Sequence, residues 1–206
     1  MILFHFLFIF FLFFLSTVKF SERQHQRFRS SLLAYLDGAA EERKLHEVQA
    51  TTEEYLRIRR KGSGTDIFIR MAEAVVGCDL SAYVDDSIFQ QNEDAIINIS
   101  SWLNDLYSYN REMAYKERSN LVYHLLVNNK EMKPQQAYDK GTLMMYEWVE
   151  IWKVTSKQLL LKYPDDQGLA RYLDELNSWY TGNQVFSYNN PRYAEYNKNV
   201  SLKRFL

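Results

Sequence analysis

Apolar side chains recur every three or four residues along most of the chain, the spacing that places them on one face of an α-helix. No stretch alternates apolar and polar residues as a half-buried strand does, and the chain has no glycine-rich phosphate loop and no internal repeat. We therefore expect an all-α protein in which a bundle of helices packs around one core. The helical periodicity covers residues 20–38, 51–64, 66–77, 91–117, 133–164 and 166–188.

Several ends of these helices are marked by residue type. Thr51 and Glu54 have the spacing of a capping box, in which each side chain accepts a hydrogen bond from the other residue's backbone N–H. Pro134 suits the first turn of a helix, where its missing N–H leaves no bond unmade. Gly38 is expected to end the first helix, and Gly-Ser-Gly at 62–64 is expected to break the chain between two helical pieces.

The composition is that of a globular chain with a core. Hydrophobic residues make up 47% of the 206 residues, which excludes a largely disordered chain. Lysine and arginine (25) nearly balance aspartate and glutamate (26), and no basic stripe is interleaved with aromatics, so we expect no nucleic-acid partner. The single cysteine, Cys78, excludes an internal disulfide framework and fits a reducing, cytoplasmic compartment.

The first 15 residues, MILFHFLFIFFLFFL, are almost entirely apolar and have three interpretations. A secretory signal would carry a positive residue before the apolar run and a small-x-small cleavage site, and neither is present. A membrane span needs about 20 apolar residues, so this run is short. The third interpretation, which we favour, is a non-coding tract read in frame, with 1–19 an aberrant tract and 20–206 the helical domain. Membrane contact is expected only if the tract is a genuine protein segment.

Asn104, Ser108 and Glu112 are spaced four residues apart within NDLYSYNRE, so they share one stripe of the predicted helix. Their side chains offer an amide oxygen, a hydroxyl and a carboxylate, all hard oxygen ligands that suit Mg²⁺. One carboxylate is too little charge to hold this ion alone. About six oxygens are needed, so water and an anionic substrate, most naturally a diphosphate, would supply the rest. Arg111 lies beside the stripe and is placed to contact the same anion, although a solvated polar face is the alternative interpretation.

Arginines flank this stripe on both sides in the sequence. Arg57, Arg59 and Arg60 come just before the Gly-Ser-Gly break, and Arg192-Tyr193 follows the aromatic-rich last helix. Guanidinium groups bind phosphate oxygens bidentately, and the end of a broken helix exposes backbone groups to a pocket. Each arginine alone fits ordinary surface charge, but the set in this order indicates a diphosphate site.

The segment NDLYSYNRE resembles the second metal motif, N-D-x-x-S-x-x-x-E, of class I terpene synthases, and the chain is most similar to fungal sesquiterpene synthases. The resemblance implies a helical bundle of the isoprenoid synthase type. It also implies that Asn104, Ser108 and Glu112 bind one Mg²⁺ of a three-metal cluster and that Arg111 contacts diphosphate. The similarity runs from about residue 20 to about residue 193 and corresponds to the C-terminal part of the catalytic domain.

An upstream segment, EYLRIRRKGSG, is similar to the family's Y-x-x-x-R-R-x-T-x-G sequence. The resemblance implies that Arg59, with Arg60 as its rival, senses the diphosphate. Gly62 and Ser63 then occupy the linker and effector positions of a kinked helix, with a carbonyl of the kink facing the substrate. The family usually has Thr or Asp at the linker, so Gly62 is a departure that loosens this coupling.

The segment GNQVFSYNNPRY is similar to the terminal G-N-x-x-W-S…R-Y pattern of the family. The resemblance implies that Arg192 and Tyr193 bind diphosphate, and it places Phe186 where the family has tryptophan. An aromatic face there would stabilise a carbocation. Tyr107 and Trp102 are further aromatic candidates, and both fit a core position equally well.

One motif of the family has no match in this chain. The first metal site of the family is an aspartate-rich D-D-x-x-D/E sequence well upstream of the second. Asp85-Asp86 has no third acid and lies too close before Asn104, and Asp165-Asp166 comes after the metal helix. Both pairs are interpreted as helix-end or loop carboxylates. We therefore expect that the upstream half of the domain is missing from this chain.

Three functional hypotheses follow. The first is a Mg²⁺-dependent cyclase that converts an allylic isoprenoid diphosphate, farnesyl diphosphate by preference, to a sesquiterpene plus diphosphate. The second is a truncated, catalytically inactive relative, and the third is a membrane-anchored helical interaction protein. For the chain as written we expect little or no turnover of farnesyl diphosphate with Mg²⁺.

Overall fold

The computed structural model describes residues 20–45 and 49–197, so the apolar tract at 1–19 and the expected boundary at its end lie outside the described residues. Within these ranges every regular element is a helix, and none of them is long and apolar enough to span a membrane. The elements are α2 (Glu22–Lys44), α3 (Thr52–Gly62), α4 (Thr65–Val76), the 3₁₀ helix η1 (Ser81–Tyr83), α5 (Ser87–Ala114), α6 (Leu121–Val127), α7 (Pro134–Lys162), α8 (Gln167–Asn189) and α9 (Pro191–Ala194).

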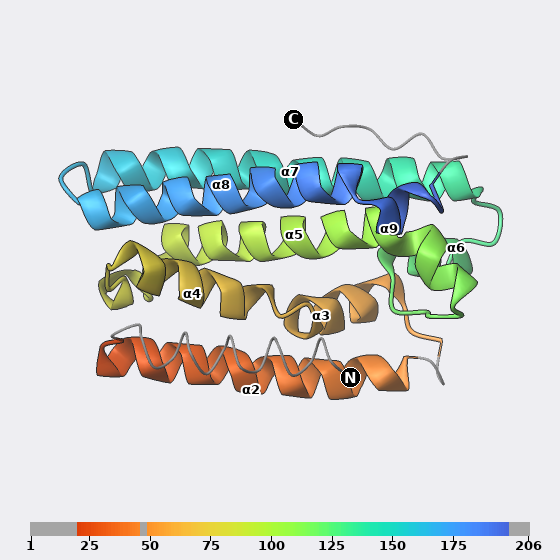
Figure 1. Ribbon diagram of the computed structural model, residues 1–206, viewed down its shortest axis with the longest axis horizontal. Helices are drawn as coiled ribbons and strands as arrows, with labels where there is room; N and C mark the ends of the chain where they lie inside the picture. Colours follow the sequence, from red (N-terminus) through yellow and green to blue (C-terminus); the bar gives the residue numbers. More distant parts are fainter. Residues whose placement is uncertain (1–19, 46–48, 198–206) are drawn as a thin grey trace.

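Helix α5 is the centre of a layered bundle (Figure 1). It packs against α7 and α8 on one side and against α3 and α4 on the other, while α2 forms the outermost layer against α3 and α4. Apolar side chains such as Ile96, Leu103 and Leu106 of α5 are completely buried. A helix surrounded on several sides by other helices can position polar side chains accurately, because packing locks its rotation. The candidate metal stripe lies on this helix.

The predicted helix starts are confirmed where the signal is a local capping pattern. The Thr51 side chain accepts from the backbone N–H of Glu54, whose carboxylate accepts from the N–H of Thr51, and Pro134 opens α7. Asp86 caps α5 by accepting from Ile88, and Asp166 caps α8. Both aspartate pairs are therefore helix-end features, as predicted from their positions.

The prediction that Gly38 ends the first helix is wrong, because α2 continues through it to Lys44. A Cβ atom at Gly38 would lie 2.5 Å from the backbone nitrogen of Gly62 and 2.7 Å from the Cβ of Lys61. Gly38 thus marks the point where α2 and α3 cross with their backbones in close approach, one of the two common uses of glycine. Glycine is needed at position 38 because α3 approaches there, at Gly62, 24 positions later in the chain. The residues next to Gly38 in the sequence give no indication of this contact.

The predicted break between α3 and α4 is confirmed. Gly64 adopts a left-handed conformation with φ +70°, which a residue with a side chain rarely adopts, and α4 starts directly after it. Ser63 closes α3 with its backbone N–H donating to the carbonyl of Arg59 at 2.9 Å. The last turn of α3, which ends at this break, contacts α5 through Arg59 on Asn104 and Arg60 on Asp94.

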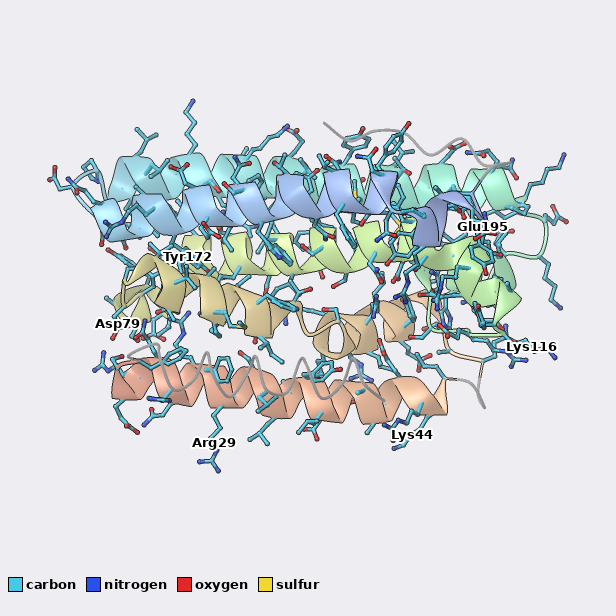
Figure 2. The ribbon with its side chains drawn as sticks, in the orientation of Figure 1. Arg29, Lys44, Asp79, Lys116, Tyr172 and Glu195 are labelled. Atoms are coloured by element: carbon cyan, nitrogen blue, oxygen red, sulfur yellow. The ribbon has the colours of Figure 1, made fainter. Side chains whose placement is uncertain are left out.

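A buried group of charges holds α2, α4, α5 and α8 together. The guanidinium of Arg27 bonds to both carboxylate oxygens of Glu73 at 2.9 and 3.0 Å, and Arg70 pairs with Glu93 at 2.5 Å. Tyr172, labelled in Figure 2, donates its hydroxyl to Glu93 at 2.9 Å. Breaking one partner of such a buried set leaves an uncompensated charge, which costs several kcal/mol. The set ties the outer layer to the central helix.

Candidate active site

The amide of Asn104 joins residues from two other helices. Its Oδ1 accepts from Nη2 of Arg59, in the last turn of α3, at 2.9 Å. Its Nδ2 donates to the hydroxyl of Tyr193, in α9, at 3.3 Å. A guanidinium has donors only, so the carbonyl oxygen of the amide must be the atom that faces Arg59. Three residues predicted for the site, separated by 45 and 89 positions in the sequence, therefore meet at one point.

Arg59 lies among carboxylates, and its side chain is only 12% exposed. Its Nε and Nη2 bond to Asp105 at 2.9 and 2.8 Å, and Nη1 lies 3.4 Å from Glu42. Burial alone disfavours the charged guanidinium, but Asp105, with smaller contributions from Tyr55 and Glu42, raises the net pKa of Arg59 above its ordinary value. Arg59 is a fixed positive charge at this site.

Asp105, which the sequence reasoning left without a role, connects the elements that surround the site. Its carboxylate accepts from Arg59, from the hydroxyl of Tyr55, and from the backbone N–H of Leu121 at 2.9 Å. Its backbone carbonyl accepts from Asn120 at 2.8 Å. Burial raises the pKa of Asp105, and the bonds from Arg59 and Tyr55 oppose that rise. The sequence could have indicated a role for Asp105 through its position on the buried face of the helix, because an unpaired acid there would cost free energy.

Ser108 and Glu112 continue the stripe toward the end of α5. Ser108 is buried, and its hydroxyl lies close enough to Glu112 to lower the pKa of that carboxyl. Burial has the larger effect and, together with the nearby Asp105, raises the pKa of Glu112 to about 7. Oε2 of Glu112 accepts from Asn120 at 2.8 Å. Two of the three predicted oxygen ligands are thus neighbours in space.

These donors fit a hard divalent cation only in part. Amide, hydroxyl and carboxylate oxygens are suitable ligands for Mg²⁺. Within residues 20–45 and 49–197, no three His, Cys, Asp or Glu side chains cluster to hold a metal. An ion bound at the stripe would therefore meet one carboxylate and two neutral oxygens, and further oxygens from water or an anion would complete its shell.

A cavity of about 550 Å³ opens beside Arg59 and Asn104. Its lining includes the polar side chains of these two residues and of Ser63 together with several aromatic rings. The rings of Phe68 (α4) and Trp179 (α8) stack there with centroids 6.1 Å apart. This volume lies in the range of small-molecule sites, which combine an apolar wall with a few convergent polar groups. The cavity suits a ligand with an anionic head and an apolar body. The lining residues are Arg59, Ser63, Thr65, Phe68, Ser100, Ser101, Asn104, Trp179, Gly182, Asn183 and Phe186.

A sequence model of the family described as terpene synthase family 2, C-terminal metal binding, matches residues 11–150. The chain belongs to this terpene synthase family. The matched residues include the arginines of α3 and the whole stripe on α5. They end before α8 and α9, so Phe186, Arg192 and Tyr193 lie outside the match.

Relatives from fungi are similar over most of the chain. A Coprinopsis cinerea protein named linoleate 10R-lipoxygenase COP4 is 28% identical over 171 residues, which cover 82% of this chain and 50% of that protein. Sesquiterpene synthase 6 of Postia placenta is 27% identical over 172 residues, with 81% and 50% covered. The chain therefore spans about half the length of these relatives. The names of these two relatives describe different reactions, so the similarity supports the family and does not identify the reaction of this chain.

The fold is that of class I terpene synthases, as predicted. The structure of 2-methylisoborneol synthase from Streptomyces coelicolor A3(2) superposes with a TM-score of 0.74 at 20% identity. The superposition covers 91% of this chain and 57% of the synthase. At this identity the likeness shows the fold alone, which is the all-α isoprenoid synthase fold.

Three predicted cations of this terpene synthase chain do not line the cavity. Arg60 pairs with Asp94 of α5, the guanidinium of Arg111 lies 4.9 Å from the ring centre of Tyr115, and that of Arg192 lies 5.8 Å from the ring centre of Tyr193. Between the two rival arginines of α3, the structure therefore places Arg59 at the cavity. A diphosphate role for the other three cations stays a prediction.

The aromatic candidates divide in the same way. Phe186 lines the cavity and is 60% exposed. Trp102 packs edge-on against Trp148, and Tyr107 is buried, so both belong to the core, the alternative that the sequence left open. The sequence reasoning missed Phe68 and Trp179, because helical phase shows that a residue faces inward without showing which helix it meets.

Proposed function

We propose that this chain carries half of a terpene cyclase active site, in which Mg²⁺ and the diphosphate of an allylic isoprenoid bind between α3, α5 and α9. The observation that carries the proposal is the placement of the Asn104 amide between Arg59 and Tyr193, with Asn104 and Arg59 lining a cavity that also has aromatic walls. Farnesyl diphosphate is the expected substrate, and a sesquiterpene plus diphosphate are the expected products. The family membership supports this class of reaction.

Each residue of the site would have a distinct task. Asn104, Ser108 and Glu112 would hold the cation, and Arg59 and Tyr193 would donate hydrogen bonds to the diphosphate oxygens. Bound Mg²⁺ would supply positive charge that stabilises the departing diphosphate. Because Arg59 is already fixed by Asp105, it requires little reorganisation when negative charge develops on the leaving group, which is the basis of electrostatic catalysis.

The aromatic side chains of the cavity wall would contact the isoprenoid chain. Phe68, Trp179 and Phe186 line the cavity, and an aromatic ring whose face meets a cation can stabilise it by about 0.5–2 kcal/mol. Apolar walls also exclude water, which would otherwise quench a carbocation. The wall residues therefore serve both binding and control of the carbocation.

Binding of farnesyl S-thiolodiphosphate, which resists ionisation, tests the proposal. Titrated into the full chain and followed by tryptophan fluorescence, it should bind in a Mg²⁺-dependent manner. Arg59→Ala should weaken this binding roughly tenfold or more, the range for losing a hydrogen bond to a charged group. Arg57→Ala on the same helix is the matched control, because the Arg57 side chain is 59% exposed and pairs with Glu41. Binding that is independent of Mg²⁺ and insensitive to Arg59→Ala would contradict the proposal.

Turnover is a separate measurement. Incubation of the chain with farnesyl diphosphate and Mg²⁺, analysed by gas chromatography with mass spectrometry, should give little or no terpene, because one carboxylate provides a single partial metal site. Product that disappears in Glu112→Ala would show instead that this half of the site is sufficient. Binding without turnover supports the half-site assignment, and absence of both would overturn it.

A further inference from the structure

We propose that Arg59 acts as an internal cation that occupies the metal-facing oxygen of Asn104, so that a divalent metal and Arg59 compete for this atom. The inference rests on the proposed function, because it concerns how the same site is loaded. Its consequence is that an anion, by drawing the guanidinium toward itself, frees the oxygen for the metal.

The geometry of the amide leaves little freedom at this position. The Nδ2 group of Asn104 is engaged by the hydroxyl of Tyr193, and Oδ1 accepts from Arg59 at 2.9 Å. Rotating the amide by half a turn would set two donors, Nδ2 and the guanidinium, against each other. The oxygen that would bind a metal is therefore the atom that Arg59 contacts.

Carboxylates of the protein itself hold Arg59 in place. Asp105, completely buried, bonds to its Nε and Nη2, and Glu42 lies on the far side of the guanidinium at 3.4 Å from Nη1. Only Nη2 is shared between Asp105 and Asn104. A small rotation of the guanidinium can thus release Asn104 while the bond from Nε to Asp105 persists.

A metal approaching Asn104 in this arrangement meets a fixed positive charge at hydrogen-bond distance from its ligand atom. The carboxylates of Asp105 and Glu42 offset part of that charge, and the remaining repulsion together with the occupied oxygen disfavours the metal. A diphosphate adds negative charge, which offsets the repulsion between the metal and Arg59. It also competes for Nη2 of Arg59, which releases Oδ1 of Asn104 for the metal. Thermodynamic linkage then requires that anion and metal each raise the affinity for the other by the same factor.

Binding of Mn²⁺ alone to the full chain tests the competition, with free Mn²⁺ measured by electron paramagnetic resonance in the absence of any phosphate. Arg59→Met should bind Mn²⁺ roughly tenfold more tightly than the wild type, since it removes one hydrogen bond to Oδ1 and its charge. Arg57→Met is the matched control, because it removes one positive charge from the same helix at a side chain that is 59% exposed and pairs with Glu41. It should change the affinity less than twofold.

Inorganic pyrophosphate tests the coupling. Added at saturation, it should raise the Mn²⁺ affinity of the wild type roughly tenfold or more, and it should raise that of Arg59→Met by a clearly smaller factor. If Arg59→Met does not fold, the double variant Arg59→Met/Asp105→Asn, which removes both charges of the buried pair, replaces it. Circular dichroism and the melting temperature establish folding of each variant.

The outcomes separate this inference from the proposed function. Mn²⁺ binding that Glu112→Ala abolishes but that Arg59→Met leaves unchanged or weakens would overturn the competition and leave the metal site standing. Absence of Mn²⁺ binding in the wild type and in Arg59→Met, with and without pyrophosphate, would overturn both. Tighter binding in Arg59→Met together with a reduced effect of pyrophosphate supports the inference.

Discussion

Tyr55 of α3 donates its hydroxyl proton to the carboxylate of Asp105 of α5, and both side chains are completely buried. The same carboxylate receives Arg59, so the bond from Tyr55 fixes one side of the group that positions this arginine. The burial of the pair and the nearby carboxylate raise the pKa of Tyr55 well above its ordinary value, so the phenol stays protonated and remains a donor. The α3–α5 contact therefore links the stability of the fold to the geometry of the site.

Removing this hydroxyl should destabilise the protein. Tyr55→Phe should lower the free energy of unfolding by about 1.5–3 kcal/mol, the range for a hydrogen bond to a charged group, as measured by urea denaturation. Tyr138→Phe is the matched control, because the buried Tyr138 hydroxyl makes no hydrogen bond to any described residue. That change should be neutral or slightly stabilising. Equal effects of the two substitutions would show that the bond to Asp105 contributes nothing.

The close crossing of α2 and α3 predicts opposite effects for two glycine substitutions. Gly38→Ala should lower the free energy of unfolding by about 1–3 kcal/mol, because the new methyl group would overlap the backbone at Gly62. Gly182→Ala, within α8, should raise it by up to about 1 kcal/mol, because alanine favours the helix and the methyl group meets no described atom within 4 Å beyond the adjoining backbone of α8. Thermal unfolding of the two variants checks the signs. A stabilising Gly38→Ala would contradict the crossing.

Acid should remove the contribution of Asp86. A hydrogen bond from Lys162 and then one from Tyr163 lower the pKa of the Asp86 carboxyl to about 2. The unfolded chain has a pKa near 3.9 for aspartate, so ionised Asp86 stabilises the fold above about pH 4, and this stabilisation is lost as the pH falls toward 2. Asp86→Asn keeps an oxygen for the N–H of Ile88 and should cost about 1 kcal/mol at pH 7, allowing for the half-exposed Lys162.

The measurement is the difference in unfolding free energy between wild type and Asp86→Asn from pH 7 to pH 2. The difference should shrink between pH 4 and pH 2, where the Asp86 carboxylate takes up a proton and becomes neutral, as asparagine already is. Asp85→Asn, at the exposed neighbouring position, is the control for replacing an acid in this segment. A difference that stays constant with pH would show that the ionised carboxylate is not the stabilising form.

The aromatic wall should matter for the apolar part of a ligand and not for its head. Trp179→Ala should weaken binding of farnesyl S-thiolodiphosphate roughly fivefold to tenfold, through loss of about 1 kcal/mol or more of apolar contact. Binding of inorganic pyrophosphate with Mg²⁺ should be unchanged, since Trp179 lines the cavity with an apolar ring that stacks on Phe68. Calorimetry measures both. Leu161→Ala, which alters another large apolar side chain, 71% exposed on α7, should affect neither.

Features that depend on a few neighbouring residues could be predicted from the sequence. The capping box at Thr51, the proline at the start of α7 and the break at residues 62–64 all depend on residues within about one helical turn, and all three are confirmed. Gly38 shows the limit. Its sequence context is that of a helix end, but its position is set by the approach of α3, which lies in a different part of the chain.

The sequence by itself determined the helical periods, the family and the oxygen stripe at Asn104, Ser108 and Glu112, because spacing along one helix is a local property. Only the tertiary structure decided which arginine reaches that stripe, that Asp105 holds it, and that Phe68 and Trp179 form the cavity wall. The physical reason is that side chains from different helices meet through burial and packing of the whole bundle. Helical phase indicates which face is buried, and only the assembled layers determine what that face contacts.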